Sequence, residues 1–272
     1  MKHRKVYYYD DELEDEFSGI KRKTITVDEN FQYNHGKLWC AAAWVLYHII
    51  MTPVAFIYMK LNFGVRIEGR DKLGKISGDT GEKSVFFYGN HTHIPGDGYI
   101  PTCISFPRKA IILAHPDNVS LYGTKNIMEM LGAFPIPNKL GGMKNFLGEL
   151  AHCVDKGYPV FIYPEAHIWP YYTKIRSFNE SSFRYPVIYN RPAYSFTITY
   201  QKYLFRTKIT IYIDGPFYPD TTINPRQAAA RLRNQVYDAM TARSENSTYE
   251  KVEYIKKGDS HEHPVLRKFP RL

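Results

Sequence analysis

An uncharged stretch from Leu38 to Met59 limits most strongly what this chain can fold into. Its twenty-two residues contain no Asp, Glu, Lys or Arg, and a lysine borders each end. About 20 apolar residues suffice to cross a bilayer as a helix. Pro53 lies past the middle, where it permits a bend, and basic residues flank both sides, so the positive-inside rule assigns no orientation. We therefore expect a hairpin or interfacial helix pair that enters one leaflet and returns. A single span and a buried helix of a soluble domain are the alternatives.

The rest of the chain is polar and basic. It has 272 residues, with 36 Lys and Arg against 27 Asp and Glu and a net charge of +9. That length can bury a substantial core in one large domain or two small ones, and a mean hydropathy of -0.41 excludes a polytopic membrane protein. The charge indicates an anionic partner, which can be membrane lipid, nucleic acid, or a phosphorylated substrate or carrier. Three widely spaced cysteines, Cys40, Cys103 and Cys153, fit small buried residues in a reducing compartment.

Short runs rich in β-branched and aromatic residues alternate with helical patterns after Lys60. Strands that alternate with helices are typical of an α/β layer with a largely parallel sheet. We expect an α/β fold: a mixed, largely parallel sheet flanked by helices, with an N-terminal apolar membrane-associating helical segment. The strands are expected at residues 65–68, 84–88, 110–113, 159–163, 193–200 and 207–213, and the helices at 119–131, 143–156 and 227–241.

The same pattern divides the chain into four segments. They are a polar N-terminal segment (1–37), the membrane-associating segment (38–59), a folded domain (60–243) and a polar, basic tail (244–272). We expect the tail to be loosely held. No apolar run follows the first basic residues, so we expect no secretory signal.

The sharpest polar cluster follows the expected strand at 84–88 and has the sequence Asn-His-Thr-His-Ile-Pro-Gly-Asp. Functional groups collect beyond the carboxyl ends of strands in open α/β sheets. His91 and Asp97 are therefore a candidate base and its orienting carboxylate. His93 and Asp97 would meet on a helix, but the proline between them disfavours helical geometry, and a turn folds Asp97 back toward His91. Alternatively, Asp97 only caps a helix and His91 is a turn histidine.

A metal-dependent hydrolase that uses His91, His93 and Asp97 is one alternative function. Metallohydrolases often carry His-x-His-x-Asp-His, whereas here the aspartate comes four residues after the second histidine and no histidine follows it. No other His or Cys pair has convincing ligand spacing. We therefore expect no metal site.

A second polar cluster, Tyr-Pro-Glu-Ala-His, follows the expected strand at 159–163. Its Glu165 should share the sheet edge with His91, where it can accept hydrogen bonds from a substrate or from backbone amides. Alternatively, Glu165 is an ion-paired carboxylate at a strand end. Between the two clusters, an extended segment at 131–140 carries Lys139, which either reaches a phosphate as a point charge or is simply solvated.

In this order, the three blocks resemble the glycerolipid acyltransferase superfamily, of the lysophosphatidic-acid acyltransferase or phospholipid-glycerol acyltransferase type. That superfamily carries Asn-His-x4-Asp after a strand, then Gly-x-x-Phe-Ile-x-Arg, then Phe-Pro-Glu-Gly, then a Val-Pro-like block. The resemblance covers about residues 60–220 and extends to the apolar segment upstream. The matching positions are Asn90, His91 and Asp97, then Gly132 to Asn138, then Tyr163 to Ala166, and finally the stretch around Arg191 to Phe196.

The chain departs from these blocks at three places. Five residues instead of four separate His91 from Asp97, and Ala166 replaces the glycine after Glu165. Asn138 stands where the family arginine would bind the acceptor phosphate. We therefore expect a divergent member in which the catalytic pair is retained and the acceptor contacts are altered. Cations that can replace the arginine are Lys139, Lys144, Lys174 and Arg176.

The resemblance implies an O-acyltransferase of the 1-acylglycerol-3-phosphate acyltransferase type. A fatty acyl group would move from a thioester, either acyl-CoA or acyl carrier protein, to a hydroxyl of a lysophospholipid or related glycerolipid. His91 would be the general base and Asp97 would orient it, while the expected substrate-binding residues are Asn90, Asn138, Lys139, Pro164 and Glu165.

The resemblance also implies where and with what the chain works. The thioester is a co-substrate, and we expect no other cofactor. The basic residues are dispersed and no binding motif accompanies them, so we expect no nucleic-acid partner. We expect the chain at a membrane lipid surface, on its cytoplasmic face. A non-catalytic lipid-binding protein on the same fold is the second alternative function.

Overall fold

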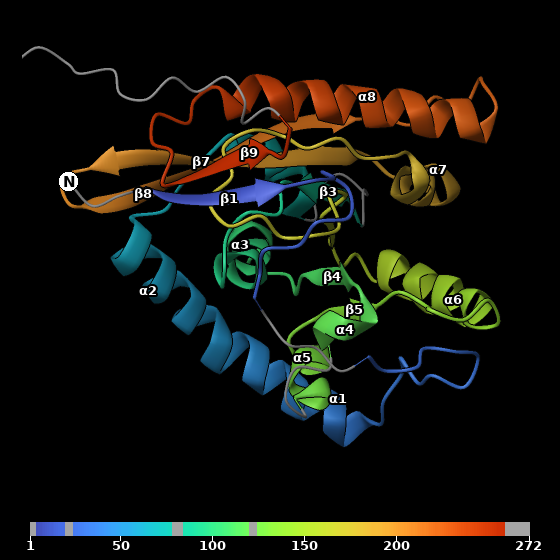
Figure 1. The fold of residues 1–272 in the computed structure, drawn as a ribbon. Coiled ribbons are helices and arrows are strands. Elements are labelled where there is room, and N and C mark those ends of the chain that lie inside the picture. Colours follow the sequence, from blue (N-terminus) through green and yellow to red (C-terminus); the bar gives the residue numbers. More distant parts are fainter. Residues whose placement is uncertain (1–3, 20–23, 78–83, 120–123, 259–272) are drawn as a thin grey trace, which may run out of the picture.

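The computed structural model describes residues 4–19, 24–77, 84–119 and 124–258 (Figure 1). Within these residues, seven strands form the main sheet in the order β2-β8-β7-β3-β6-β4-β5. All neighbouring pairs are parallel except β7 and β8, which confirms the expected mixed, largely parallel sheet. The strands are β2 (Arg66–Glu68), β3 (Phe86–Gly89), β4 (Ile111–Ala114), β5 (Ala133–Pro135), β6 (Val160–Ile162), β7 (Ala193–Tyr203) and β8 (Arg206–Phe217).

Parallel pairing brings the carboxyl ends of β3, β4, β5, β6 and β7 to one edge of the sheet, which we call the carboxyl edge. Strands β8 and β2 run the opposite way. Because the three polar blocks of the sequence follow β3, β5 and β6, all of them lie along this edge. Functional groups of open α/β sheets are usually found there.

Helices cover both faces of the sheet (Figure 1). The helix expected at 119–131 is wrong as a single element, because two short helices, α4 and α5, occupy the described part of this region and residues 120–123 lie outside it. Pro116 is the first residue of α4, since proline is pre-organised for the start of a helix. The helices are α1 (Lys37–Trp44), the π-helix η1 (Val45–Met51), α2 (Thr52–Phe63), η2 (Arg70–Ser77), α3 (Gly96–Ser105), α4 (Pro116–Val119), α5 (Lys125–Met130), α6 (Gly142–Asp155), η4 (Ser181–Phe183), α7 (Arg184–Tyr189) and α8 (Pro225–Ser244).

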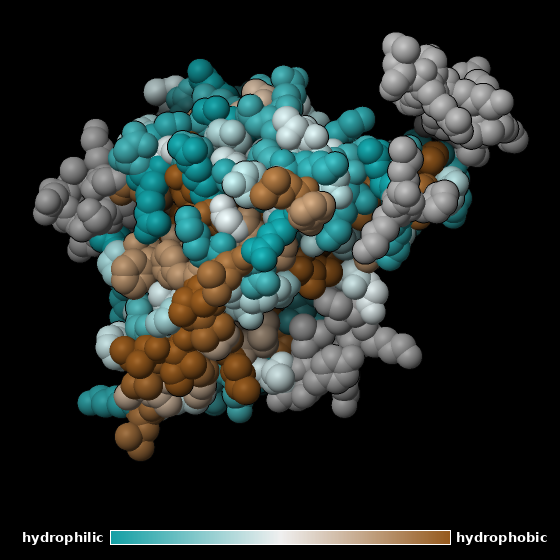
Figure 2. All heavy atoms as spheres, turned by 90° about the vertical axis from the view of Figure 1, so that its left-hand side faces the viewer, coloured by the Kyte–Doolittle hydropathy of each residue, from teal (hydrophilic) through white to brown (hydrophobic). Residues whose placement is uncertain are grey.

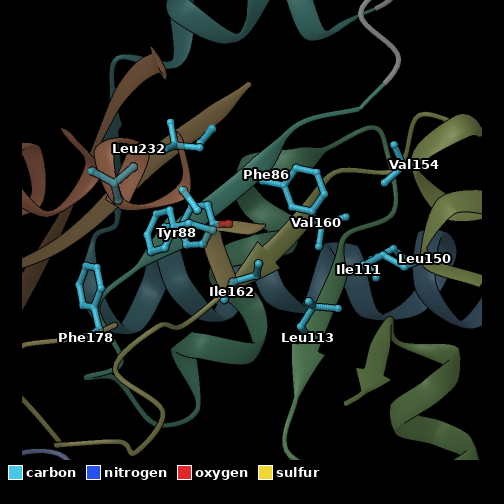
Figure 3. Close-up of a cluster of buried hydrophobic side chains, with 14 of the residues drawn as sticks. Phe86, Tyr88, Ile111, Leu113, Leu150, Val154, Val160, Ile162, Phe178 and Leu232 are labelled. Atoms are coloured by element: carbon cyan, nitrogen blue, oxygen red, sulfur yellow. The ribbon is translucent and has the colours of Figure 1, made fainter. Parts of the chain in front are cut away.

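Strand β3 separates two apolar cores, because successive side chains of a strand point to opposite faces. Phe86 and Tyr88 pack with residues of α6 and α8, and Figure 3 shows them beside Val160 and Ile162 of β6. Phe87 points to the other face, where α2 and α3 pack. The three β3 side chains are at most 1% exposed, and burying one such side chain stabilises a fold by about 1.5–3 kcal/mol. The strand that leads into the first polar block is therefore firmly held.

The apolar stretch forms one helix from Lys37 to Phe63, made of α1, η1 and α2 (Figure 1). The expected hairpin at Pro53 is therefore wrong. In a π-helix each amide bonds to the carbonyl five residues back, and here both the amide and the hydroxyl of Thr52 bind the Tyr47 carbonyl. Pro53 comes directly after this widened turn, so its missing N–H is accommodated without a reversal of the chain.

One side of this helix packs on the domain and the other side is exposed. Ala55 and Met59 are buried in the core with α3, and the Tyr47 hydroxyl donates to Thr102 Oγ1 at 3.0 Å while it accepts the Ala110 amide. Of the residues described, this is the one helix long and apolar enough to cross a membrane, which makes it a candidate membrane-associating segment. Its exposed apolar residues, part of the patch in Figure 2, are Leu38, Trp44, Val45, Ile49, Ile50, Val54, Ile57 and Leu61.

A second, two-stranded sheet joins the two terminal segments of the described chain. Strand β1 (Lys5–Tyr9) pairs in parallel with β9 (Val252–Lys256). The expectation of a loosely held tail is therefore wrong for β9, while residues 259–272 lie outside the described residues. The physical reason is aromatic packing: Tyr254 of β9 stacks on Trp169 with ring centroids 4.9 Å apart, and Phe17 meets the same indole edge-on at 5.3 Å.

Candidate active site

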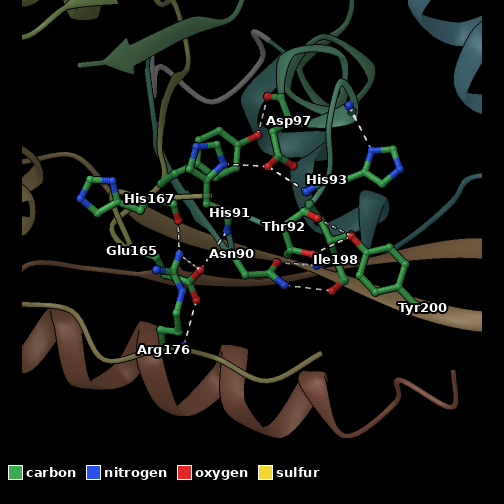
Figure 4. A network of polar contacts seen from close by, with 12 residues as sticks. Asn90, His91, Thr92, His93, Asp97, Glu165, His167, Arg176, Ile198 and Tyr200 are labelled. Carbon is green, nitrogen blue, oxygen red and sulfur yellow. Dashed lines mark hydrogen bonds and ion pairs between the residues drawn. The ribbon is translucent and has the colours of Figure 1, made fainter. Parts of the chain in front are cut away.

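The turn after β3 brings His91 and Asp97 together at the carboxyl edge (Figure 4). His91 Nδ1 lies 2.7 Å from Asp97 Oδ2. Asp97 stands in the first turn of α3, where the positive end of the helix dipole favours a carboxylate. The His91 side chain is 15% exposed, and no described residue forms a hydrogen bond with its Nε2. The pair therefore has one ring nitrogen oriented by a carboxylate and the other available to a ligand.

Two further contacts fix the imidazole of His91. Tyr163, directly after β6, stacks on the ring with centroids 4.6 Å apart and planes at 22°, and its hydroxyl donates to the Asp97 carbonyl at 2.6 Å. Burial raises the pKa of Tyr163 well above its usual value, so the hydroxyl stays protonated and keeps donating. The backbone carbonyl of His91 accepts the Trp169 amide at 3.0 Å. His91 is thus held through its ring face, its Nδ1 and its backbone.

His93 has the opposite surroundings. Asp97 Oδ2 receives the backbone amide of His93 at 3.0 Å, and the ring nitrogen Nδ1 of His93 accepts the Gly96 amide at 3.0 Å. The ring is fully buried and meets Phe63 edge-on, with centroids 4.5 Å apart. Burial lowers the pKa of His93 to about 4, so the ring is neutral at neutral pH. His93 therefore shapes the turn, and His91 is the histidine that is open to a ligand.

This geometry does not favour the metal-dependent alternative. Among the residues that the structure describes, no three His, Cys, Asp or Glu side chains are placed to hold a metal ion. His91 and His93 direct their Nδ1 atoms to different protein partners, Asp97 and the Gly96 amide. The two histidines of the His-x-His element therefore do not converge on one point.

Asn90 is buried and hydrogen-bonded to the backbone of β7. Its Nδ2 donates to the Ile198 carbonyl at 3.0 Å and its Oδ1 accepts the Ile198 amide at 2.8 Å. The side chain is buried, so the amide group replaces strand pairing between the turn and β7. Thr92 also contacts β7, because its hydroxyl lies 2.6 Å from the hydroxyl of Tyr200. Both side chains fasten the turn that carries His91 to β7.

Glu165 shares the carboxyl edge with His91, as expected, but its side chain is buried and fully paired. The carboxylate forms an ion pair with Arg176 at 3.0 Å, and both side chains are at most 1% exposed. Oε1 also accepts the Arg176 amide at 3.0 Å, and Oε2 accepts the His91 amide at 3.1 Å. The ion-paired alternative therefore replaces the expected contact with the acceptor, and Arg176 leaves the set of phosphate candidates. Pro164 is half-buried and lies in the chain between the end of β6 and Glu165.

The block after β5 contacts the N-terminal segment. Asn138 Oδ1 accepts the Val27 amide at 3.0 Å, and its Nδ2 donates to the Ile25 carbonyl at 2.8 Å. These backbone partners engage both ends of the amide group, whose side chain is exposed, and a contact of Asn138 with substrate stays a prediction. Lys139 is exposed next to it at the carboxyl edge and stays a candidate for contact with a phosphate.

Sequence reasoning missed Tyr163 as a partner of the catalytic pair, and it missed the loop that carries Trp169. A signal for Tyr163 was available, since the acyltransferase block has phenylalanine there and the extra hydroxyl needs a buried acceptor. No comparable signal existed for Trp169, whose indole Nε1 donates to the Asp15 carbonyl at 2.7 Å. Residues so distant in sequence are brought together only by the whole fold.

Known proteins give a limited comparison. No family model matches the chain, and no curated protein matches it. Among solved structures, it is similar to the 1-acyl-sn-glycerophosphate (LPA) acyltransferase PlsC from Thermotoga maritima, with 14% sequence identity and a TM-score of 0.49. The similarity covers 78% of this chain and 96% of that chain. A likeness of this extent shows neither a family nor an activity.

Proposed function

We propose that this chain transfers a fatty acyl group from a thioester donor to a hydroxyl of a glycerolipid acceptor at a membrane surface. One observation carries the proposal: His91 is oriented by Asp97 through Nδ1, at 2.7 Å, while none of the described residues forms a hydrogen bond with its Nε2 at the carboxyl edge. An imidazole held in this way is suited to remove a proton from a hydroxyl group. The described neighbourhood of His91 offers no serine or cysteine hydrogen-bonded to it, which favours direct transfer to the acceptor.

The reaction then proceeds by general-base catalysis. His91 Nε2 takes the proton of the acceptor hydroxyl as its oxygen attacks the thioester carbonyl carbon. The new C–O bond forms, the C–S bond breaks, and the proton on Nε2 passes to the leaving thiolate. Asp97 fixes the imidazole tautomer and stabilises the imidazolium, as the aspartate does in a hydrolytic triad. General-base assistance of this kind contributes about 10²–10⁴ to the rate.

The other site residues support this chemistry by positioning. Tyr163 holds the face of the imidazole and the backbone of Asp97. Glu165 accepts the backbone amide of His91, and its ion pair with Arg176 fixes the carboxylate in the position that this contact needs. Lys139 is the candidate for contact with an acceptor phosphate, since it is exposed at the carboxyl edge and backbone groups engage both ends of the neighbouring Asn138 amide.

The exposed apolar side of the helix from Lys37 to Phe63 supports a lipid setting for the reaction. Both a lysolipid acceptor and the acylated product reside in a bilayer, so a domain held there meets them directly. The donor, acyl-CoA or acyl carrier protein, is a cytoplasmic thioester, and we therefore place the site at the cytoplasmic face of the membrane.

The proposal is tested by replacing the base. His91→Ala should lower acyl transfer by at least about 10²-fold, measured as lysolipid conversion by mass spectrometry with a panel of acyl-CoA and acyl carrier protein donors. Because the variant also loses the contacts of the ring with Tyr163 and Asp97, turnover is compared at a temperature where circular dichroism shows that both proteins are folded. His115→Ala is the matched control, since His115 follows β4 at the same edge, is exposed and also lies beside an aspartate, Asp117.

Two results would contradict the proposal. Near-normal turnover by His91→Ala would remove the base assignment. Binding of lysolipid vesicles by the wild-type protein, without transfer from any thioester in the panel, would favour the non-catalytic lipid-binding alternative.

A further inference from the structure

The hairpin between β7 and β8 ends in two large apolar residues. Leu204 and Phe205 form the turn that joins Tyr203 to Arg206. Two-residue hairpin turns usually carry Asn, Asp or Gly, because their backbone requires positive φ. Leu204 has a φ of 50°, and Leu204 and Phe205 are 74% and 103% exposed. The turn conformation does not favour large apolar residues at these two positions, and neither side chain is buried in the domain.

A basic cavity lies beside this hairpin tip. It has a volume of about 290 Å³ and is lined by the last turn of α2 and by the ends of β7 and β8. Its charged lining residues are Lys60, Arg206 and Lys208, and none of the residues that line it is acidic. Three cations without an acidic neighbour in the lining are suited to bind phosphate groups.

The hairpin and the apolar helix form one continuous surface. Arg206 Nη1 donates to the Leu61 carbonyl at 3.3 Å, which joins the hairpin to the end of α2. Leu61 is 66% exposed and continues the apolar side of the helix up to the cavity. In Figure 1 the upper end of α2 and the hairpin end of β7 and β8 lie on the same side of the molecule, the side that Figure 2 turns toward the viewer.

This surface adjoins the candidate active site. Strand β7 is parallel to β3 and continues past its end, where Gly89 pairs with Phe196. The turn with His91 follows β7 as far as Tyr200, and the hairpin tip lies beyond it on the same side of the sheet. Phe63 lines the basic cavity and its ring packs edge-on against His93 of that turn, with centroids 4.5 Å apart. A lipid surface that contacts both the helix and the hairpin therefore lies next to the site.

We propose that the β7–β8 hairpin is a second membrane contact. Leu204 and Phe205 insert into the interface of an anionic bilayer, and the cations Lys60, Arg206 and Lys208 bind its lipid phosphates. The inference deepens the proposed function, on which it rests for the choice of a lipid over a protein as the occupant of this surface. Charge complementarity supports the anionic lipid, since apolar residues flanked by cations are typical of segments that lie in the interface.

The experiment measures co-sedimentation of the full chain with vesicles of phosphatidylglycerol and phosphatidylcholine in equal parts, and with vesicles of phosphatidylcholine alone. The double variant Leu204→Asn, Phe205→Gly supplies a favoured turn sequence and removes both apolar side chains. It should bind both kinds of vesicle at least about tenfold more weakly. Ile188→Asn is the matched control, because Ile188 is 58% exposed on α7, away from the hairpin (Figure 1), and it should bind like wild type.

A second variant tests the charges. Lys60→Gln, Arg206→Gln, Lys208→Gln should lose about a hundredfold in binding to the anionic vesicles, since each cation at an anionic surface contributes about fivefold. Its binding to phosphatidylcholine alone should change little, and its salt dependence should be shallower. Arg226→Gln, which removes one exposed cation at the start of α8, is the control for a single charge outside this surface and should weaken binding by much less than fivefold.

Wild-type affinity of the Leu204→Asn, Phe205→Gly variant for anionic vesicles would overturn the proposal. If that variant unfolds, Phe205→Trp replaces it: brominated lipid should quench its fluorescence more than that of wild type, and equal quenching would also overturn the proposal. Vesicle binding does not depend on turnover, so near-normal turnover by His91→Ala, or an absence of acyl transfer by the wild type, would contradict the proposed function and leave this result distinguishable.

Discussion

The turns that follow β3 and β6 lie side by side at the carboxyl edge, and each carries a carboxylate near a strand end. Glu165, after β6, is buried against a guanidinium and its two oxygens receive three donors. Asp97, after β3, is also buried but faces the imidazole of His91. Arginine stays charged at any working pH, whereas an imidazole gains and loses a proton near neutrality. The difference teaches that the partner, not the position, decides whether a carboxylate fixes structure or supports proton transfer.

The largest expected effect is on acyl transfer, and it tests the role of Asp97 in this comparison. Asp97→Asn keeps the shape of the side chain but cannot stabilise an imidazolium, so acyl transfer should fall by about 10²–10⁴-fold. The measurement is product formation under conditions where wild type and variant are equally folded by circular dichroism. Asp117→Asn, which changes the exposed His115–Asp117 contact, should retain activity. Full activity in Asp97→Asn would place this aspartate with Glu165 as a structural group.

The second effect tests the structural side. Glu165→Gln leaves the buried Arg176 without its charge partner, and breaking a buried pair of this kind costs about 3–5 kcal/mol of unfolding free energy. Urea unfolding measures the loss. The double variant Glu165→Gln, Arg176→Met should recover part of it, because no unpaired charge is then buried. Asp220→Asn, at an exposed pair with Arg231, should change stability little. A stable but inactive Glu165→Gln variant would contradict the structural role of Glu165 and indicate that its carboxylate acts on the substrate.

The third effect separates the two histidines of the turn through pH. The pKa of His93 falls from 6.5 to about 4 on burial, so below pH 6.5 the unfolded chain binds a proton that the folded protein does not. Wild type therefore loses stability as the pH falls from 6.5 toward 4, by up to about 3 kcal/mol. The His93→Asn variant keeps an acceptor for the Gly96 amide, and its unfolding free energy should fall by less than that of wild type between pH 6.5 and 4. If the unfolding free energies of the two proteins fall in parallel as the pH is lowered, the pKa of His93 is not lowered in the folded protein.

The smallest effect concerns Tyr163, which links the two turns. Tyr163→Phe keeps the ring on His91 but removes the donor to the Asp97 carbonyl, a hydrogen bond that contributes about 1 kcal/mol. The turnover number should fall about fivefold at an unchanged KM, because the imidazole is positioned less well. Tyr189→Phe is the matched control, since its hydroxyl donates to the Leu147 carbonyl at 2.9 Å, away from the site. An equal loss of turnover in both variants would indicate general destabilisation.

The sequence was sufficient for six of the seven strands of the main sheet, because their apolar runs are short and rich in β-branched and aromatic residues. Strands β1 and β9 were not predicted, and β5 was expected only as an extended segment. The sequence was also sufficient to pair His91 with Asp97, since the intervening Pro-Gly excludes a helix and folds the aspartate back. Both predictions depend on local chemistry alone. The proximity of Glu165 to His91 followed from parallel strand order, which is likewise a local pattern repeated along the chain.

What the sequence could not supply is the choice of partner for each polar side chain. The amide of Asn90 and the amide of Asn138 look alike in sequence, yet each satisfies a different distant backbone segment. The continuation of the apolar helix past Pro53 also depends on contacts between distant residues. Tyr47, in the π-helical turn before Pro53, forms hydrogen bonds with Thr102 and Ala110. Such partners are decided only when elements far apart in the chain pack together.

The pairing of β1 with β9 has a consequence for how the protein is made. A ribosome releases residues 5–9 long before residues 252–256, so β1 waits for almost the whole chain before it can pair. Tyr254 of β9 closes the aromatic packing around Trp169, whose amide holds the carbonyl of His91. Contacts between such distant segments form late in folding. The geometry of the catalytic turn is therefore completed only after synthesis has passed residue 254, and a nascent chain still lacking that strand does not yet have a finished site.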